Sequence, residues 1–316
     1  MIVVTGAGGF IGSNLVRSLN RRTTMGIVAV DDFNQQEKVD ILNYMNCILI
    51  DRSNFLDFLK TNGKKIKIVY HLGARTDTTE TDVEIFNKLN LNYSKAIWNI
   101  CTEHRIRLIY ASSAATYGNG EFGYDDDNTH YTVQLKPLNP YGDSKQDFDL
   151  WALQRDETPP FWIGLKFFNV YGYGEFNKGR MASVVYHAIN KIKETKSMSL
   201  FKSHNPDYED GEQMRDFISV DDVVRICYEF MSKGSGNSGL YNVGTGKART
   251  FIDLVKAVFS AMDIEENINF IDTPIDIRDK YQYFTEATTK KLKKVGIGTD
   301  FIDLELGIKH YVHNSM

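Results

Sequence analysis

A glycine-rich turn near the N-terminus constrains the fold of this chain more than any other segment. It reads Thr5-Gly6-Ala7-Gly8-Gly9-Phe10-Ile11-Gly12 and directly follows the apolar run Ile2–Val4. Glycines allow the tight turn and let the backbone approach a diphosphate, whose charge is favoured by the amino end of the following helix. Asp31 follows Gly12 by 19 residues, close to the roughly 20-residue offset of an acid that binds a ribose. The pattern therefore predicts a strand-turn-helix unit that binds a dinucleotide, rather than a tight turn without a ligand.

Short β-branched and apolar runs alternate with longer amphipathic segments along the chain. Strands are expected at Ile2–Val4, Ile27–Val30, Ile66–Tyr70, Leu108–Ala111, Trp162–Phe167 and Phe217–Ser219. Several of these runs lack polar alternation, as strands of a parallel sheet covered by helices on both faces should. The expected fold class is therefore α/β, with a doubly wound Rossmann-type parallel sheet.

A smaller C-terminal lobe is expected to be interleaved with this sheet. Beyond Phe168 the chain has three glycines, a helix-like stretch, a short strand at Ser199–Phe201 and a polar acidic loop at 204–212. Phe217–Ser219, followed by Asp221 and Asp222 as a helix N-cap, predicts a return to the sheet. We expect a dinucleotide-binding domain at 1–170 plus about 216–247, and a substrate-binding lobe at about 171–215 and 248–316.

Composition limits the partners of the chain. The net charge of −4 gives no basic surface for a nucleic acid. Cys47, Cys101 and Cys227 lie far apart and no Cys/His ligand spacing accompanies them, so we expect reduced thiols and no metal. No leader-like segment and no apolar stretch of about 20 residues is evident. The expected setting is cytoplasmic, without a membrane or nucleic-acid partner.

A helix beginning at Pro140 is expected to carry a tyrosine and a lysine on one face. Proline marks the first turn, so Tyr141 and Lys145 become i and i+4 neighbours. A tyrosine is a poor base near neutral pH, but an adjacent ammonium favours its phenolate. The segment Tyr110–Gly118 ends a predicted strand with hydroxyl groups, at the edge where open α/β sheets bind ligands. We interpret Ser113, Tyr141 and Lys145 as a hydride-transfer triad, although this tyrosine-lysine spacing also arises by chance on helices.

These features resemble the extended short-chain dehydrogenases that act on nucleotide sugars. The matching motifs are the glycine turn, Ser113, Tyr141 with Lys145, Arg215-Asp216-Phe217 and Tyr241-Asn242-Val243-Gly244-Thr245-Gly246. Other motifs resemble the ADP-glycero-manno-heptose 6-epimerases more narrowly. They are His71-Leu72-Gly73-Ala74 followed by Thr78-Thr79-Glu80, Ala111–Gly118, Phe168–Gly172 with Lys178-Gly179 and Met181-Ala182-Ser183-Val184, and Tyr281-Gln282 with Phe284-Thr285. The resemblance covers nearly the whole chain.

The resemblance implies a role for each matching residue. Tyr141 and Lys178 would be the two acid/base groups, Lys145 would contact the tyrosine and the nicotinamide ribose, and Ser113 would lie near the reacting hydroxyl. The implied cofactor contacts are Gly6, Gly9, Phe10, Ile11, Gly12, Asp31, Asp32, Lys38, Arg52, Leu72, Gly73, Ala74, Asn90, Tyr141, Lys145 and Val170. The implied substrate contacts are Ser113, Asn169, Lys178, Arg180, His187, Phe201, Lys202, Ser203, His204, Arg215 and Tyr281.

The chain departs from the family pattern at two places. Arg180 stands where relatives usually carry serine, and an acidic insertion from Asn205 to Met214 lengthens the loop before Arg215. Three implied residues also have plainer interpretations. His187 fits a core histidine, Arg215 fits an ion pair with Asp216, and Lys178 fits an ordinary loop lysine.

The choice of cofactor is open on the residues alone. Asp31 favours NAD, because a carboxylate accepts from a ribose 2′-hydroxyl and repels a 2′-phosphate. Lys38 and Arg52 could neutralise that carboxylate and hold a 2′-phosphate, or they could be solvated surface cations. The resemblance favours NADP.

The resemblance implies that the chain interconverts ADP-D-glycero-β-D-manno-heptose and its L-glycero epimer, supplying heptose for the lipopolysaccharide inner core. The ligand is then an ADP-sugar, and the family is typically homo-oligomeric, as a pentamer. Another nucleotide-sugar epimerase, a dehydratase, or a non-catalytic NADP-binding protein are the alternatives. A dehydratase would carry acidic residues directly after the catalytic serine, where this chain has Ala114 and Ala115.

Overall fold

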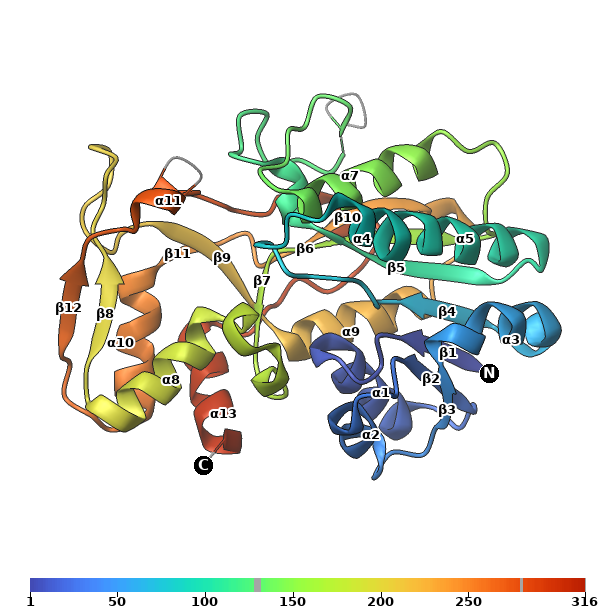
Figure 1. Cartoon of the computed structure of the whole chain (residues 1–316), viewed down its shortest axis with the longest axis horizontal. Helices are drawn as coiled ribbons and strands as arrows, with labels where there is room; N and C mark the ends of the chain where they lie inside the picture. The colour runs from blue at the N-terminus through green and yellow to red at the C-terminus, as the bar shows by residue number, and fades with distance from the viewer. Residues whose placement is uncertain (128–131, 279–280, 316) are drawn as a thin grey trace.

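A computed structural model of the chain describes residues 1–127, 132–278 and 281–315. Its largest sheet is parallel throughout, with the strand order β10-β6-β5-β4-β1-β2-β3 (Figure 1). The strands are β1 (Ile2–Thr5), β2 (Ile27–Asp31), β3 (Ile48–Asp51), β4 (Ile68–His71), β5 (Arg107–Ser113), β6 (Trp162–Phe167) and β10 (Gly239–Val243). The chain runs outward from β1 to β3 and then crosses to β4 on the other side of β1. This reversal is the point where ligands bind in open α/β sheets.

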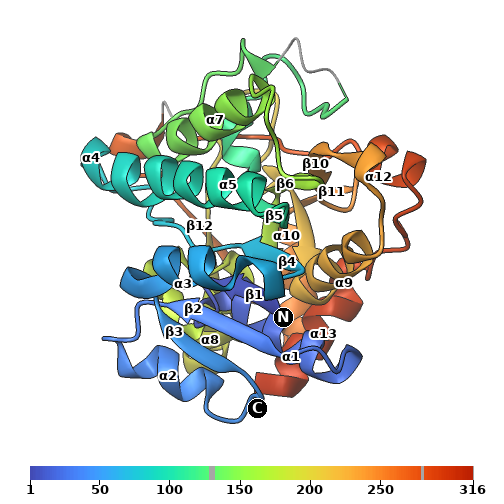
Figure 2. The ribbon, with the colours of Figure 1, turned by 90° about the vertical axis from the view of Figure 1, so that its right-hand side faces the viewer.

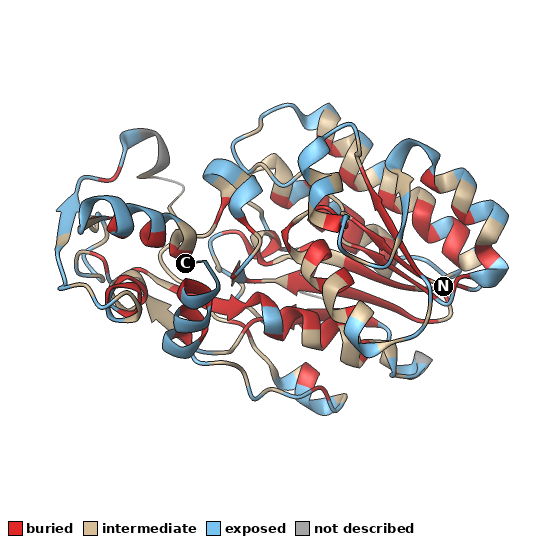
Figure 3. Ribbon diagram, turned by 90° about the horizontal axis from the view of Figure 1, so that it is seen from below, coloured by how far each residue is buried: buried red, intermediate tan, exposed pale blue. Residues whose placement is uncertain are grey.

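Helices cover both faces of the seven-stranded sheet, which confirms the doubly wound class (Figure 2). Alternate residues of β1 point to opposite cores: Ile2 and Val4 pack in one, and Val3 packs in the other. The first core lies under α1 (Phe10–Arg22), α2 (Gln36–Leu42) and α9 (Val220–Met231). The second lies under α3 (Phe55–Asn62), α5 (Tyr93–Glu103) and α7 (Pro140–Leu153). The strands between them are almost wholly buried, except for the edge strand β3 (Figure 3).

A smaller lobe lies beyond the carboxyl ends of the strands, to the left in Figure 1. It contains a sheet of β7 (Asn169–Tyr171), β9 (Met214–Ser219) and β11 (Ala248–Thr250), and a pair of β8 (Met198–Phe201) with β12 (Ile268–Ile271). A separate hydrophobic core joins these strands to α8 (Val184–Thr195), α10 (Phe251–Ala261) and α13 (Leu304–Ser315).

Short helical segments connect these elements. Around the carboxyl edge of the sheet lie α4 (Val83–Phe86), a π-helical turn η3 (Asn87–Asn92), η4 (Ala114–Tyr117) and η5 (Phe176–Met181). The others are η1 (Arg52–Asn54), η2 (Gly63–Lys65), η6 (Ser235–Asn237), α11 (Ile275–Arg278) and α12 (Lys290–Lys294).

The prediction that Phe217–Ser219 returns to the large sheet is wrong. That segment belongs to β9, which pairs with β7 and β11, and the chain re-enters the seven-stranded sheet through β10 instead. The predicted helix cap is also displaced. Ser219 caps α9 by accepting from the backbone N–H of Asp221, and Asp221 and Asp222 lie in the first helical turn.

Candidate functional site

The glycine turn brings the amino end of α1 to the carboxyl edge of the sheet. Gly6 has φ +67°, a conformation that side chains disfavour. A Cβ on Gly12 would lie 2.0 Å from the carbonyl oxygen of Gly6, so no larger residue fits there. Gly9 is the N-cap of α1 and offers no side chain to the first-turn amides. Those N–H groups are therefore left for a ligand, and an anionic one suits the helix dipole.

A cavity of about 570 Å³ opens in front of this turn and gathers most of the predicted cofactor residues. Its volume lies in the range of small-molecule sites. The predicted residues that line it are Gly6, Gly9, Phe10, Ile11, Gly12, Asp31, Lys38, Arg52, Leu72, Gly73, Ala74, Ser113, Tyr141, Lys145, Val170, Lys178 and Arg180. Within the described chain, no group of three or more His, Cys, Asp or Glu side chains could hold a metal ion.

Asp31 is enclosed by donors from the protein itself. Its carboxylate accepts from the N–H of Gly8 at 2.9 Å and from the N–H of Asp32 at 2.8 Å. The Lys38 ammonium pairs with it at 2.7 Å. Asp32 is turned away from the cavity and pairs with Arg52 at 3.5 Å. The two cations thus neutralise the acidic end of β2 within the cavity rather than standing free in solvent.

The triad residues converge from β5 and α7. Asn139 caps α7 by accepting from Gly142 N–H at 2.9 Å, which sets Tyr141 and Lys145 one turn apart. Lys145 Nζ donates to the carbonyl oxygen of Ala111 at 2.7 Å, and burial lowers the pKa of its ammonium to about 8. Burial raises the pKa of the Tyr141 phenol, and a hydrogen bond with Ser113 opposes that rise. A hydroxyl, a phenol and an ammonium therefore lie in sequence on one wall of the cavity.

Asp149 supports this wall, and the sequence analysis did not single it out. It is fully buried one helical turn beyond Lys145. Its carboxylate accepts from Tyr110 at 3.0 Å, from Ser112 at 2.7 Å and from Lys166 at 2.7 Å. Its charge also opposes the lowering of the Lys145 pKa by burial. The i+4 offset from Lys145 was the available signal, but an acid at that offset is commonly a surface ion pair.

Lys178 approaches the same cavity from the opposite lobe. It lies on η5 with Nζ 5.4 Å from the centre of the Phe10 ring, and burial lowers the pKa of its ammonium. Glu175 fixes the segment, because its buried carboxylate accepts from Gly172 N–H at 3.2 Å and from the Ser183 hydroxyl at 2.7 Å. Lys178 is thus held by its surroundings, unlike an ordinary loop lysine.

Arg180 bridges η5 to the loop after β4. Its guanidinium lies 3.5 Å from a carboxylate oxygen of Asp77 and hydrogen-bonds the Thr79 hydroxyl. Thr78 contacts Met181 in the same place. Arg180 therefore closes one rim of the cavity, where a serine could not span the gap.

Asn90 lies behind the cavity wall rather than on it. It is 2% exposed; its amide oxygen accepts from Arg75 N–H at 2.8 Å and its amide nitrogen donates to Ser144 at 3.0 Å. The structure therefore gives it contacts that position the loop after β4 against α7, and its implied cofactor contact stays a prediction.

The other predicted substrate residues lie away from this cavity. Arg215 is buried on β9, with its guanidinium 5.8 Å from the Tyr281 ring, and Phe201 lies 6.2 Å from the same ring. Lys202, Ser203 and His204 follow Phe201, and His204 N–H donates to Tyr283 at 2.8 Å. Asn169 and His187 are exposed and do not join this cluster or line the cavity, so His187 is not a core histidine.

The plainer interpretation of Arg215 also fails. Asp216 makes its contacts with Thr245, Gly246 and Ala287, and no ion pair joins it to Arg215 among the residues described. Phe201, Tyr281 and Tyr283 form an aromatic cluster beside Arg215. The acidic insertion adds Tyr208 to this cluster, 5.2 Å from the Tyr283 ring.

Among the helices in the described ranges, none combines the length and the apolar character that a membrane-spanning helix needs.

Comparison with known proteins agrees with this geometry. The chain is 46% identical to an ADP-L-glycero-D-manno-heptose-6-epimerase of Fusobacterium nucleatum, over 99% of this chain and 97% of that one. The structure of the Helicobacter pylori ADP-L-glycero-D-manno-heptose-6-epimerase superposes with a TM-score of 0.82 at 28% identity, covering 99% of this chain and 95% of that chain. MoeE5, solved with UDP-glucose and NAD, superposes with a TM-score of 0.79 at 25% identity, covering 99% and 98% respectively. Residues 2–244 match the model of the NAD dependent epimerase/dehydratase family, and the chain belongs to that family.

Proposed function

We propose that this chain interconverts ADP-D-glycero-β-D-manno-heptose and ADP-L-glycero-β-D-manno-heptose by epimerisation at C6″. The names of its relatives support the substrate. The observation that carries the proposal is the pair of proton-transfer groups that line one cavity from opposite lobes, Tyr141 on α7 and Lys178 on η5.

The chemistry explains why two such groups are needed. C6″ bears no acidic proton, because no carbonyl lies next to it, so the carbon cannot be inverted by simple deprotonation. A nicotinamide dinucleotide held by the cavity at the glycine turn would supply the missing step, because it can accept a hydride and return it. The transient 6″-ketone then presents its other face before the hydride returns. One residue removes the hydroxyl proton in one orientation, and the other returns a proton in the second.

Each residue has a defined part in this cycle. Tyr141 exchanges the hydroxyl proton in this proposal, which is supported by the hydrogen bond between Ser113 and its phenol and by Lys145 one turn away. Lys178 exchanges the proton on the opposite side, and burial lowers the pKa of its ammonium, which makes it a better proton donor than a solvated lysine. The aromatic cluster around Arg215 would hold the ADP part. In this proposal the cofactor domain comprises about 1–168 and 220–247, because β7 and β9 pair within the smaller lobe, and the substrate lobe comprises about 169–219 and 248–316.

The preferred cofactor in this proposal is NADP. In a site selective for NAD, the acid at the end of β2 would face the ribose 2′-hydroxyl. Here the Asp31 carboxylate already accepts from Gly8 and Lys38, while Lys38 and Arg52 line the cavity. A 2′-phosphate would find two cations and a neutralised acid.

The test is turnover of ADP-heptose in deuterated water. If the same hydride leaves and returns, the epimerised product carries no deuterium on carbon, although its hydroxyl proton exchanges. An enolising route through the ketone would label C5″ or C7″ instead. Mass spectrometry of the product distinguishes the two results. Carbon-bound deuterium at a level matching turnover would reject direct return, and absence of turnover would reject the substrate.

A further inference from the structure

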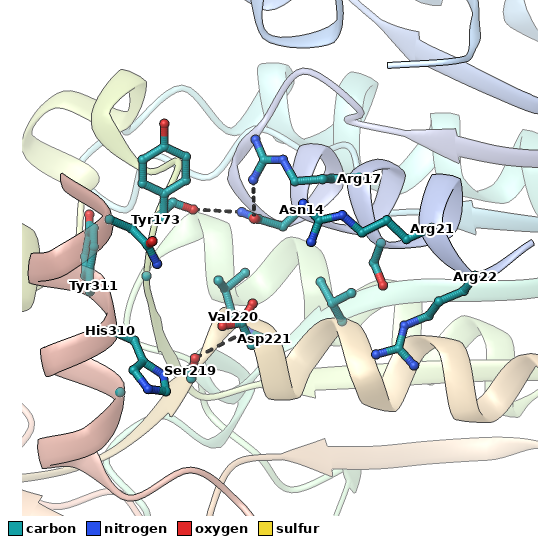
Figure 4. Close-up of a pocket in the computed structure, with 15 residues that line it drawn as sticks. Asn14, Arg17, Arg21, Arg22, Tyr173, Ser219, Val220, Asp221, His310 and Tyr311 are labelled. Atoms are coloured by element: carbon teal, nitrogen blue, oxygen red, sulfur yellow. Dashed lines mark hydrogen bonds between the residues drawn. The ribbon is translucent and has the colours of Figure 1, made fainter. Parts of the chain in front are cut away.

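A second cavity, of about 740 Å³, lies between α1, α9, α13 and the segment 172–173 (Figure 4). It shares no lining residue with the cofactor cavity. Its volume is that of a small-molecule site. The proposed reaction uses none of its side chains.

Three arginines of α1 give one wall of this cavity its charge. Arg17 and Arg21 stand one turn apart, and Arg22 follows. Across the described ranges, no carboxylate lies within ion-pair distance of any of the three. Arg17 hydrogen-bonds Asn14 at 3.0 Å, and Arg22 lies 5.2 Å from the Tyr228 ring, so these contacts orient two of them without neutralising their charge.

The position of these arginines is not explained by the helix alone. Cations in the last turn of a helix interact favourably with its dipole, which accounts for Arg21 and Arg22. Arg17 lies before that turn, and the facing wall is built from α13. There His310 and Asn314 stand one turn apart and line the same cavity.

The cavity has a charge gradient. Asp221, in the first turn of α9, is the acidic residue of its lining, and it comes from a different helix than the arginines (Figure 4). An anionic group would therefore settle against α1, and a hydroxyl group could donate to Asp221.

We propose that this cavity binds a small phosphorylated compound, with its phosphate against Arg17 and Arg21 and its hydroxyl-bearing part toward Asp221 and His310. Arginine forks bind phosphate oxygens by paired charge-assisted hydrogen bonds, which makes them suited to this group. The proposal concerns binding alone and does not depend on the reaction catalysed in the other cavity.

Calorimetric titration with inorganic pyrophosphate tests the site. The protein is first saturated with NADP or NAD, whichever binds more tightly, in phosphate-free buffer, so that the cofactor cavity is filled. The wild type should bind pyrophosphate, and the double variant Arg17→Gln/Arg21→Gln should bind it at least about 10-fold more weakly, since each lost contact is charge-assisted. The matched control is Arg105→Gln/Arg155→Gln, which removes two exposed arginines beside α5 and α7 on the other face of the sheet. That control should bind like the wild type.

Four results would overturn the proposal. The first is that the wild type does not bind pyrophosphate at millimolar concentration. The second is an equal loss of binding in the Arg105→Gln/Arg155→Gln control, which would indicate unspecific attraction. Loss in Arg215→Gln with retention in the α1 double variant would place the anion at the nucleotide-sugar site. Sedimentation showing that the α1 double variant dissociates an oligomer formed by the wild type would assign the cavity to a contact between copies.

Discussion

Two side chains of α7, Tyr141 and Lys145, show how burial and hydrogen bonding set the proton chemistry of single residues. Replacement of Tyr141 by phenylalanine removes the exchangeable proton and keeps the ring. We expect the variant to fold and bind its cofactor but to lose at least about 100-fold in turnover. Tyr93→Phe is the matched control, because Tyr93 lines the same cavity and donates to the Arg52 carbonyl at 3.3 Å. Turnover of ADP-heptose by both variants is the measurement, and a wild-type rate in Tyr141→Phe would refute the assignment.

Lys38 carries a second prediction at the same scale. Lys38→Ala removes a cation and leaves Asp31 without the ammonium that lies 2.7 Å away. Both effects weaken the binding of a 2′-phosphate, so the ratio of NADP affinity to NAD affinity should fall about 10-fold or more. Fluorescence titration with each reduced cofactor measures the ratio, with the exposed Lys64→Ala as control. An unchanged ratio, or a wild type without preference, would contradict the NADP proposal.

At the scale of elements, a chain of buried hydrogen bonds joins β1, β4 and η3. His71 lies between the Thr5 hydroxyl at 2.7 Å and the Ser94 hydroxyl at 2.9 Å. Gly73 N–H donates to the Thr5 hydroxyl oxygen, and a neutral His71 can accept at one ring nitrogen while it donates at the other. Ser94 in turn donates to the carbonyl of Asn90. Burial of the ring favours a neutral His71 in this chain of hydrogen bonds, because the charged form would lose its hydration.

Acid should therefore destabilise the fold through His71. Burial, followed by the charge of Lys145, lowers the pKa of His71 from 6.5 to about 3. Between these values the unfolded chain binds a proton that the folded chain does not, so folding stability falls with decreasing pH by up to about 1.4 kcal/mol per unit. His71→Asn should be less stable at pH 7 but show a shallower loss from pH 6.5 to pH 5. Urea unfolding midpoints measure both, and parallel losses in the two proteins would exclude His71 as the source.

The sequence predicts those elements whose local signal agrees with their place in the fold. The strands β1, β2, β4, β5 and β6 carry apolar runs that burial on both faces requires. The two edge strands, β3 and β10, were not predicted, although β3 carries the apolar run Ile48-Leu49-Ile50, of which Ile48 and Leu49 stay exposed. β9 was assigned to the wrong sheet because an apolar run does not encode its partner.

The residues of the candidate site also fall into two groups, those that the sequence predicts and those that only the fold brings together. Glycines, Ser113, Tyr141 and Lys145 follow from spacing within one segment. The contacts of Asp149 with Tyr110 and Lys166, and of Arg180 with Asp77, join segments that are distant in sequence. No local pattern specifies such pairings, so they became visible only in the folded chain.

At the scale of the whole molecule, the seven-stranded sheet and its core are completed by elements that lie beyond residue 170. β10 completes the edge of the seven-stranded sheet beside β6, and α9 covers the core that contains α1. A fragment of residues 1–170 should therefore aggregate or fail to give cooperative unfolding, since it exposes a strand edge and apolar core. A fragment of residues 1–247 retains both elements and should form the complete seven-stranded sheet, although it lacks α10 and α13, which share a hydrophobic core with α8 in the whole chain. Circular dichroism and light scattering compare them, and a monomeric, cooperatively folded 1–170 would show that the sheet is complete without β10.

The late arrival of β10 has a consequence for synthesis of the chain. β6 emerges from the ribosome well before β10, because the 71 residues from 168 to 238 separate the two strands. During that interval the outer edge of β6 lacks a partner, and the β6 residues Ile163 and Leu165 belong to the future core. The first part of the substrate lobe, which includes α8, β8 and β9, is thus translated before β10 can complete the sheet. Codon choice or chaperone contact over that stretch would govern the yield of native protein more than the same change after residue 243.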